Sequence, residues 1–299
     1  MITKKNLYLI STFITLLLVI LGAAPTKAFL SKIRDIVEKS QPVKIALPII
    51  SNNYVPSSDW WRPPPNAAWQ WQLSDQPIDM SFDVDMYDID MFENNAGVVA
   101  NLHEHGHKVF CYISAGSWED WRPDKHLFPE EVIGTKYEGW PDEKWLDIRR
   151  IDLLAPIMQA RLDQCKSKGF DGVEPDNIDG YTNDTGFPLT YHDQLNYNKW
   201  LAGEAHARGL SIGLKNDGDQ VGDLLPYFDW AMTEDCYVDG FCDQMKPFIN
   251  SGKAVFAAEY TDEISVDRFL NKVCPLSDSI KFSFILKDRD LDAWVKFCP

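Results

Sequence analysis

The sequence predicts a single (β/α)8 TIM barrel, and three observations predict it. Short apolar strands alternate with amphipathic helices along residues 67–299, a pattern that requires a parallel sheet. Four of the helices end at a glycine directly before the next strand. Eight strand-like segments occur in about 230 residues, the usual size of such a barrel. An open doubly wound sheet is disfavoured, because no GxGxxG or GxxxxGK[ST] loop follows any strand.

Residues 1–28 have the features of a secretory signal. Lys4 and Lys5 precede an apolar run over Leu7–Ala24, and the small residue Ala28 follows. The run is about 18 residues long, near the minimum for a spanning helix, so an uncleaved signal anchor is the competing interpretation. We therefore expect a secreted, extracellular protein, in contact with a membrane only where the signal stays uncleaved.

The next segment, residues 29–66, is expected to be a tether that leads into the barrel at residues 67–299. It ends in Trp60-Trp61-Arg62-Pro63-Pro64-Pro65. Three consecutive prolines exclude helix and favour polyproline II.

The strands and helices of the barrel follow from local signals. Glycine tolerates the left-handed conformation at a helix C-terminus, so Gly106, Gly169, Gly209 and Gly252 mark the starts of strands. The eight predicted strands are residues 69–73, 86–90, 108–114, 170–177, 210–217, 230–235, 254–261 and 281–286. Apolar residues recur at helical spacing in two intervening segments, at Leu154, Ile157, Met158, Leu162 and Cys165, and at Tyr197, Trp200, Leu201 and Ala205.

The charge balance excludes one class of partner. The chain has 29 Lys and Arg against 45 Asp and Glu, a formal net charge of -16. Residues 1–28 contain three lysines and no acid, so their removal leaves 26 basic residues against 45 acidic ones, a balance of -19. Nucleic acid is therefore a poor partner, whereas a cationic partner is electrostatically favoured.

The six cysteines are expected to form disulfides. An even number behind an export signal favours disulfides over metal ligation or redox catalysis. Six cysteines allow 15 pairings, so the sequence leaves the connectivity open. The pairs that we favour are Cys236 with Cys242, which would close a short loop, Cys274 with Cys298, which would hold the C-terminus, and by elimination Cys111 with Cys165.

Candidate functional residues follow the strands, because barrel active sites lie at the C-terminal strand ends. These positions are rich in carboxylates. Side-chain alternation predicts that Glu174, Asp176, Lys215, Asp217 and Glu259 point into the barrel. The full set is Asp88, Asp90, Tyr112, Ser114, Glu174, Asp176, Asn177, Lys215, Asn216, Asp217, Glu234, Asp235, Glu259 and Tyr260.

A group of carboxylates with one lysine and no histidine indicates glycosidic bond cleavage. That reaction needs one protonated carboxyl group to donate to the leaving oxygen and one ionised group to attack or to activate water. Serine nucleophile chemistry lacks its base, since none of the six histidines ends a strand. These patterns alone do not choose between Glu174 and Asp176.

Neither a metal nor a cofactor is expected. His103 and His107 have zinc-ligand spacing, but Gly106 ends their helix before the second histidine. A calcium loop starting at Asp83 is rejected because Asp88 stands where that loop needs glycine.

A series of strings resembles glycoside hydrolase family 114, the endo-α-1,4-polygalactosaminidases. The series covers roughly residues 67–262 and is highly specific. The resemblance implies a secreted barrel that acts on α-linked galactosamine-containing exopolysaccharide, with Asp176 as nucleophile, Glu234 as acid/base and Glu174 at the substrate site. The matching strings are WQWQL, MYDIDMF, VFCYISAGSWEDWRPD, WLDIR, GFDGVEPDNIDGY, GLSIGLKND, TEDC and AAEYT.

The expected protein is therefore a monomeric, retaining endo-glycosidase that binds a cationic or partly acetylated galactosamine polysaccharide. Retention implies about 5 to 5.5 Å between the two carboxyl groups. The alternative is a non-catalytic polysaccharide-binding barrel, such as a lectin or adhesin. Trp118, Trp121 and Trp140 lie between strands and either stack on sugar rings or anchor loops. The expected substrate-binding residues are Asp88, Asp90, Tyr112, Glu174, Lys215, Asp217, Glu259 and Tyr260.

Overall fold

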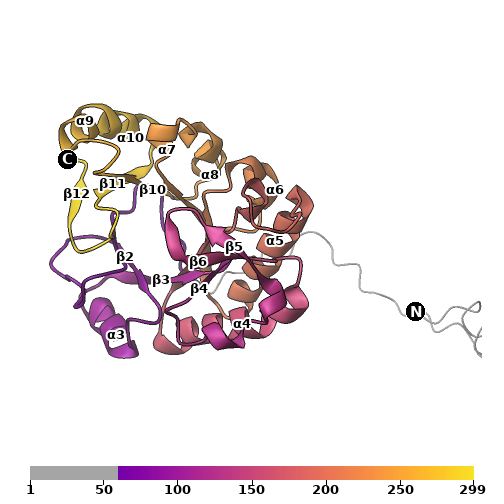
Figure 1. Ribbon diagram of the computed structural model, residues 1–299. Coiled ribbons are helices and arrows are strands. Elements are labelled where there is room, and N and C mark those ends of the chain that lie inside the picture. Colours follow the sequence, from indigo (N-terminus) through magenta and orange to yellow (C-terminus); the bar gives the residue numbers. More distant parts are fainter. Residues whose placement is uncertain (1–59) are drawn as a thin grey trace, which may run out of the picture. The chain divides into compact units, whose positions relative to one another are not determined.

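The computed structural model describes residues 60–299, which form a nearly closed barrel (Figure 1). The expected signal at residues 1–28 and the tether up to residue 59 lie outside the described residues. All eight predicted strands form, each parallel to the next, and the predicted barrel is confirmed. The strands are β1 (Trp69–Gln72), β2 (Met86–Asp90), β3 (Lys108–Ser114), β7 (Gly172–Asp176), β8 (Ser211–Lys215), β9 (Trp230–Glu234), β10 (Val255–Tyr260) and β11 (Ser283–Lys287).

Helices surround the strands and cover their outer face (Figure 1). The predicted glycine stops are confirmed: Gly169 ends α4 with φ of 96°, and the other three glycines also have positive φ. Residues 73–85 join β1 to β2 without a helix. Within residues 60–299, none of the helices is both long and apolar enough to cross a bilayer. The helices are α3 (Ala96–Glu104), α4 (Ile151–Lys168), α5 (Tyr191–Ala207), α6 (Val221–Leu224), α7 (Cys236–Asp239), α8 (Lys246–Asn250), α9 (Val266–Arg268) and α10 (Cys274–Ile280).

Aromatic rings fill the N-terminal half of the barrel interior. The rings of Phe110 and Trp230 stack with centroids 4.6 Å apart, and Trp69 packs on Phe256 at 5.1 Å. Gly213 provides the space for this packing, since a Cβ at that position would lie 2.4 Å from the Trp230 ring. The interior is therefore solid beneath the strand ends, as in other barrels of this type.

The C-terminal segment closes the barrel between β11 and β1. Strand β12 (Val295–Phe297) pairs antiparallel with β11, a strand that the sequence did not predict. On the other side, the backbone N–H of Leu73 donates to the Leu291 carbonyl at 2.9 Å, and the Gln70 amide donates to the Ala293 carbonyl at 2.9 Å.

A small antiparallel sheet is inserted after β3 and was not predicted either. It consists of β4 (Ser117–Glu119), β5 (Ile133–Tyr137) and β6 (Trp140–Leu146). Figure 1 draws it in magenta near the centre of the view. The insertion adds side chains at the end of the barrel where the parallel strands finish.

Residues 60–62, which we expected to belong to the tether, pack on the barrel instead. The Trp60 indole donates to Asp229 at 3.1 Å, and the Arg62 guanidinium pairs with the same carboxylate at 2.6 Å. The Trp60 ring also stacks on His206 at 4.3 Å. Asp229 is buried and directly precedes β9, so these contacts satisfy its charge at the N-terminal end of the barrel, opposite the strand ends.

The three favoured disulfides are present. Cys111–Cys165 joins β3 to α4, Cys236–Cys242 closes the turn after α7, and Cys274–Cys298 joins α10 to the C-terminus. The corresponding Cα–Cα distances are 6.0, 4.8 and 5.3 Å. No free cysteine remains among residues 60–299.

Removing the disulfides one at a time should lower the free energy of unfolding in the order of their loop lengths. The sequence separations are 54, 24 and 6 residues for Cys111–Cys165, Cys274–Cys298 and Cys236–Cys242. Chain entropy then predicts losses of about 4, 3 and 2 kcal/mol for the paired Cys→Ala variants. Urea denaturation measures this order, and a largest loss for the shortest loop would contradict it.

Candidate active site

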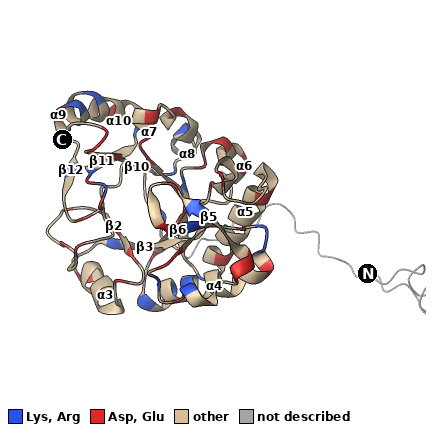
Figure 2. Ribbon diagram, in the orientation of Figure 1, with Lys and Arg blue, Asp and Glu red and all other residues tan. Residues whose placement is uncertain are grey.

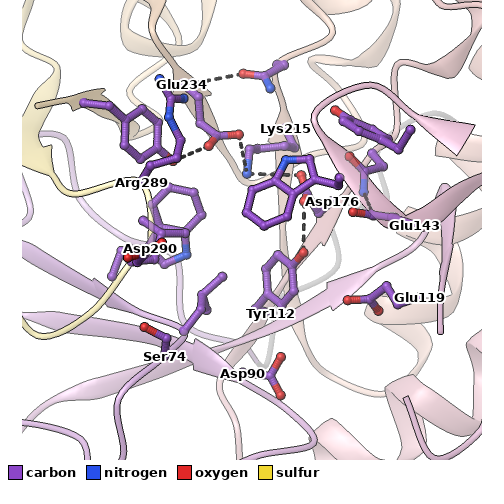
Figure 3. Close-up of a pocket in the computed structure, with 18 of the residues that line it drawn as sticks. Ser74, Asp90, Tyr112, Glu119, Glu143, Asp176, Lys215, Glu234, Arg289 and Asp290 are labelled. Carbon is purple, nitrogen blue, oxygen red and sulfur yellow. Dashed lines mark hydrogen bonds and ion pairs between the residues drawn. The ribbon is translucent and has the colours of Figure 1, made fainter. Parts of the chain in front are cut away.

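The C-terminal ends of the strands surround a cavity of about 520 Å³ (Figure 3). Figure 2 shows acidic residues on the segments that follow the strands around this opening. Six of the predicted substrate-binding and catalytic residues line the cavity, and each comes from a different strand. They are Asp90, Tyr112, Asp176, Lys215, Glu234 and Tyr260.

Strand register brings the central residues together. Asp176, Lys215 and Glu234 end the consecutive parallel strands β7, β8 and β9. The residue after each of them, Asn177, Asn216 or Asp235, has a positive φ between 54° and 62°. Asn and Asp tolerate this left-handed conformation better than other non-glycine residues, and such backbone strain is concentrated at functional sites. The chain therefore turns sharply just after each functional side chain.

Lys215 is buried at the centre of the carboxylates. Its Nζ lies 2.6 Å from Glu174 Oε1, 3.1 Å from Asp176 Oδ1 and 3.2 Å from Glu234 Oε2, and only 2% of the side chain is exposed. Burial alone would lower the pKa of Lys215, but Asp176, Glu174 and Glu234 together raise it well above its ordinary value. The lysine is therefore a permanent cation at the floor of the cavity.

Two tyrosines hold the outer oxygens of the carboxylates at the cavity. The Tyr112 hydroxyl donates to Asp176 Oδ2 at 3.0 Å, and the Tyr260 hydroxyl donates to Glu234 Oε1. Asn216 accepts from the backbone N–H of Glu234 at 3.0 Å and fixes the end of β9. The Asp176 and Glu234 side chains remain 19% and 27% exposed, so both face the cavity.

Asp88 and Glu174 lie beneath the cavity and do not line it, which differs from the expected direct contact with substrate. Both are fully buried. Burial, followed by the charge of Glu174, raises the pKa of Asp88 well above its usual range. Burial also raises the pKa of Glu174 to about 7, although Lys215 lowers it. Burial therefore favours the uncharged form of Asp88.

Glu259 points out of the barrel, so its predicted inward orientation is wrong. Its neighbours Ala258 and Tyr260 belong to the apolar cluster inside the barrel. Glu259 accepts hydrogen bonds from the backbone N–H groups of Tyr237 at 2.8 Å and Val238 at 3.2 Å, at the start of α7. Both faces of β10 are apolar, so the alternation of residue types could not show which face turns inward.

Asp217 does not reach the main cavity either. It lies beyond the end of β8, where its carboxylate accepts from the Asn198 amide at 2.9 Å. Burial raises its pKa to about 8. It lines a second cavity of about 380 Å³.

The second cavity adjoins the first on the side of Glu234, since both are lined by Asp179, Asn216, Glu234 and Asp239. No lysine or arginine lines it among the described residues. The main cavity, in contrast, contains Arg122 and Arg289 in addition to Lys215.

Several cavity residues were missed because they lie outside the barrel strands. Arg122 pairs with Asp90 at 2.7 Å and with Glu119 at 2.8 Å. Arg289 pairs with Asp235 at 2.9 Å and its guanidinium lies 3.8 Å from the Tyr260 ring centroid. Arg122 belongs to the insertion after β3, and Arg289 belongs to the C-terminal segment. A search of the barrel strand ends in the sequence does not include either region.

Glu143, on β6 of the inserted sheet, was missed for the same reason. It accepts from the Asn177 amide at 2.8 Å and from the Ser117 hydroxyl. Burial raises its pKa to about 8, so this carboxyl group is mostly neutral at pH 7. Across residues 60–299, no group of three His, Cys, Asp or Glu side chains is arranged to hold a metal ion.

Comparisons with known proteins agree with this geometry. The model of glycoside-hydrolase family GH114 matches residues 51–299. The crystal structure of Aspergillus fumigatus Ega3 in complex with galactosamine is 40% identical to this chain, with a TM-score of 0.76, over 80% of this chain and 97% of that one. No curated protein matches the sequence.

A more distant structure shares the fold. The glycoside hydrolase domain of PelA from Pseudomonas aeruginosa has a TM-score of 0.61 at 14% identity, over 79% of this chain and 99% of that domain. The family match covers the whole described barrel, with its carboxylate cluster at the strand ends. The chain therefore belongs to glycoside-hydrolase family GH114 and is an enzyme that cleaves O-glycosidic bonds.

Proposed function

We propose that the enzyme is a retaining endo-glycosidase in which Asp176 is the nucleophile and Glu234 the acid/base. Asp176 attacks the anomeric carbon while Glu234 protonates the leaving oxygen. Glu234 then takes a proton from the water that hydrolyses the glycosyl-enzyme. Of the three carboxylates that contact Lys215, Glu174 is fully buried and does not line the cavity, which leaves Asp176 and Glu234 to react.

The contact of both carboxylates with one lysine is the observation that supports retention. Asp176 Oδ1 and Glu234 Oε2 lie 3.1 and 3.2 Å from the same Nζ. These two oxygens therefore lie at most 3.1 plus 3.2, or about 6.3 Å apart, and this short spacing favours retention, since inverting enzymes separate their carboxyl groups by about 6.5 to 9.5 Å.

The shape and charge of the two cavities favour a polymeric, cationic substrate. Trp121 and Trp140 line the main cavity and are 52% and 49% exposed, which suits them to stack on sugar rings. The second cavity extends the site beyond Glu234 with acidic residues and no cation. Galactosamine is the sugar bound in the Ega3 structure, and its ammonium group complements such a surface. We infer that α-1,4-linked galactosamine polysaccharide lies across both cavities.

Secretion is part of the same proposal. Three disulfides in a chain of this size support folding in an oxidising compartment, consistent with the signal-like residues 1–28. An exopolysaccharide substrate is found outside the cell as well.

Asp176→Asn and Glu234→Gln should each lower kcat by about 1000-fold or more, because each removes a group that makes or breaks a bond. A reducing-sugar assay on partly deacetylated galactosaminogalactan measures the loss. Asp278→Asn, an exposed carboxylate on α10, is the matched control and should retain full activity. Full activity in either site variant, with an unchanged thermal midpoint, would reject the assignment.

The first product should carry the α-anomeric configuration of the substrate. Proton NMR of the reducing end, recorded before mutarotation, distinguishes the two anomers. Initial release of the β-anomer would show inversion and would contradict a double displacement at Asp176.

Salt should inhibit cleavage of the cationic polymer more than cleavage of the fully acetylated one. Raising ionic strength from about 10 mM to about 0.1 M shortens the Debye length from about 30 to about 10 Å and screens the attraction between the ammonium groups and the acidic surface. kcat/KM on both polymers across this range is the measurement. An equal response of the two polymers would mean that the acidity does not assist substrate capture.

A further inference from the structure

We propose that Lys215 is a positioning residue whose single ammonium group contacts both reacting carboxylates. Once Asp176 has been esterified, the same ammonium group stabilises mainly the ionised form of Glu234. This proposal rests on the roles proposed above for Asp176 and Glu234. It replaces the expectation that Lys215 binds substrate directly.

Carboxylates surround the lysine ammonium group on the side of the cavity. An ammonium group has three donors, and three carboxylates, those of Glu174, Asp176 and Glu234, lie within 3.2 Å of Nζ. The Trp71 ring covers a further side, with its centroid 4.6 Å from Nζ. With 2% of the side chain exposed, Lys215 acts on the reaction mainly through the carboxylates that it contacts.

Glu174 holds the Lys215 ammonium group from the side of the barrel interior. It makes the shortest of the three contacts, 2.6 Å, and is fully buried on the strand next to Lys215. Asp88 lies beside Glu174, and burial together with the Glu174 charge favours the uncharged form of Asp88. Asp176 and Glu234 lie on the cavity side of the lysine at nearly equal distances of 3.1 and 3.2 Å from Nζ. The same ammonium group therefore stabilises the negative charge of both.

The reaction changes which of the two carboxylates carries a negative charge beside Lys215. In the first step, a bond forms between an Asp176 oxygen and the anomeric carbon, the glycosidic C–O bond breaks, and the Glu234 proton passes to the leaving oxygen. Asp176 is then an uncharged ester. Of the two carboxyl groups of the catalytic pair, only Glu234 can then carry a negative charge beside Lys215. A nearby cation favours the ionised form of a carboxyl group, so the lysine now stabilises ionised Glu234.

An ionised Glu234 is the form that the second step needs. It accepts a proton from water as the water oxygen bonds to the anomeric carbon and the bond to Asp176 breaks, which restores the Asp176 carboxylate. The shared lysine thus stabilises the ionised Glu234 carboxylate while Asp176 is esterified, and it attracts both carboxylates again after the second step.

Lys215→Met tests the proposal, with Lys287→Met as the matched control. Lys287 is also fully buried at the end of a barrel strand, but its Nζ donates to the Asp292 carbonyl at 2.7 Å and it does not line the cavity. Removing the Lys215 cation disfavours the ionised forms of both carboxylates, so both limbs of the kcat/KM pH profile should move to higher pH by about one unit or more. The Lys287→Met profile should keep its limbs in place.

Glu174→Gln provides a second variant with the opposite expected sign. It removes a negative charge and leaves the lysine with two partners, so the pH profile should move to lower pH. This result remains decisive if Lys215→Met fails to fold. Intact-mass measurement under turnover adds a second readout, because glycosyl-enzyme should accumulate in Lys215→Met when the second step slows.

The outcomes separate this proposal from the proposed function. Loss of activity in Asp176→Asn and Glu234→Gln, together with an unshifted profile in Lys215→Met or Glu174→Gln, would overturn the role of Lys215 and leave the catalytic pair in place. Full activity in Asp176→Asn or Glu234→Gln would overturn the catalytic pair itself. Opposite shifts in the two variants would support the positioning role.

Discussion

The site depends on one buried cation and its three carboxylates. Lys215 lies at the centre of the barrel opening with Glu174, Asp176 and Glu234 around it, and without it those negative charges would repel one another in a poorly solvated space. The ammonium group contacts both Asp176 and Glu234, the proposed reacting pair, and so limits the distance between them. The tyrosines and the strained residues after each strand then orient the outer oxygens.

The surrounding barrel holds this charge cluster in a fixed geometry. Stacked rings of Phe110, Trp230, Trp69 and Phe256 fill the barrel below, so the polar layer rests on a rigid apolar base. The disulfide between β3 and α4 and the C-terminal segment at the β1–β11 seam hold the barrel closed around it. Rigid support of this kind keeps charged groups in one geometry through a reaction cycle.

The charged groups are unevenly distributed between the two cavities. Arg122 and Arg289 pair with three acids of the main cavity, while the charged residues described around the adjoining cavity are all acidic. A polymer that carries ammonium groups would therefore meet its strongest attraction beside the reacting carboxylates. The aromatic residues Trp121 and Trp140 add apolar faces at the open side.

The sequence by itself determined the barrel, the strand ends that contain the site and the favoured cysteine pairs. Helical spacing in α4, the glycine that ends it and the acids after β7 are local features, so they can be read without knowing the fold. The resemblance to the family selected Asp176 over Glu174. The predicted side chains Asp176, Lys215 and Glu234 do meet, because parallel strands end at one edge.

Only the tertiary structure decided the orientation of Glu259 and the burial of Asp88. It also decided that Arg122, Glu143 and Arg289 line the cavity. Alternation identifies the inner face of a strand only when its two faces differ in polarity, and both faces of β10 are apolar. The inserted sheet and the C-terminal segment reach the cavity through contacts between residues far apart in the chain. Such contacts depend on register and packing, which have no local signature in the sequence.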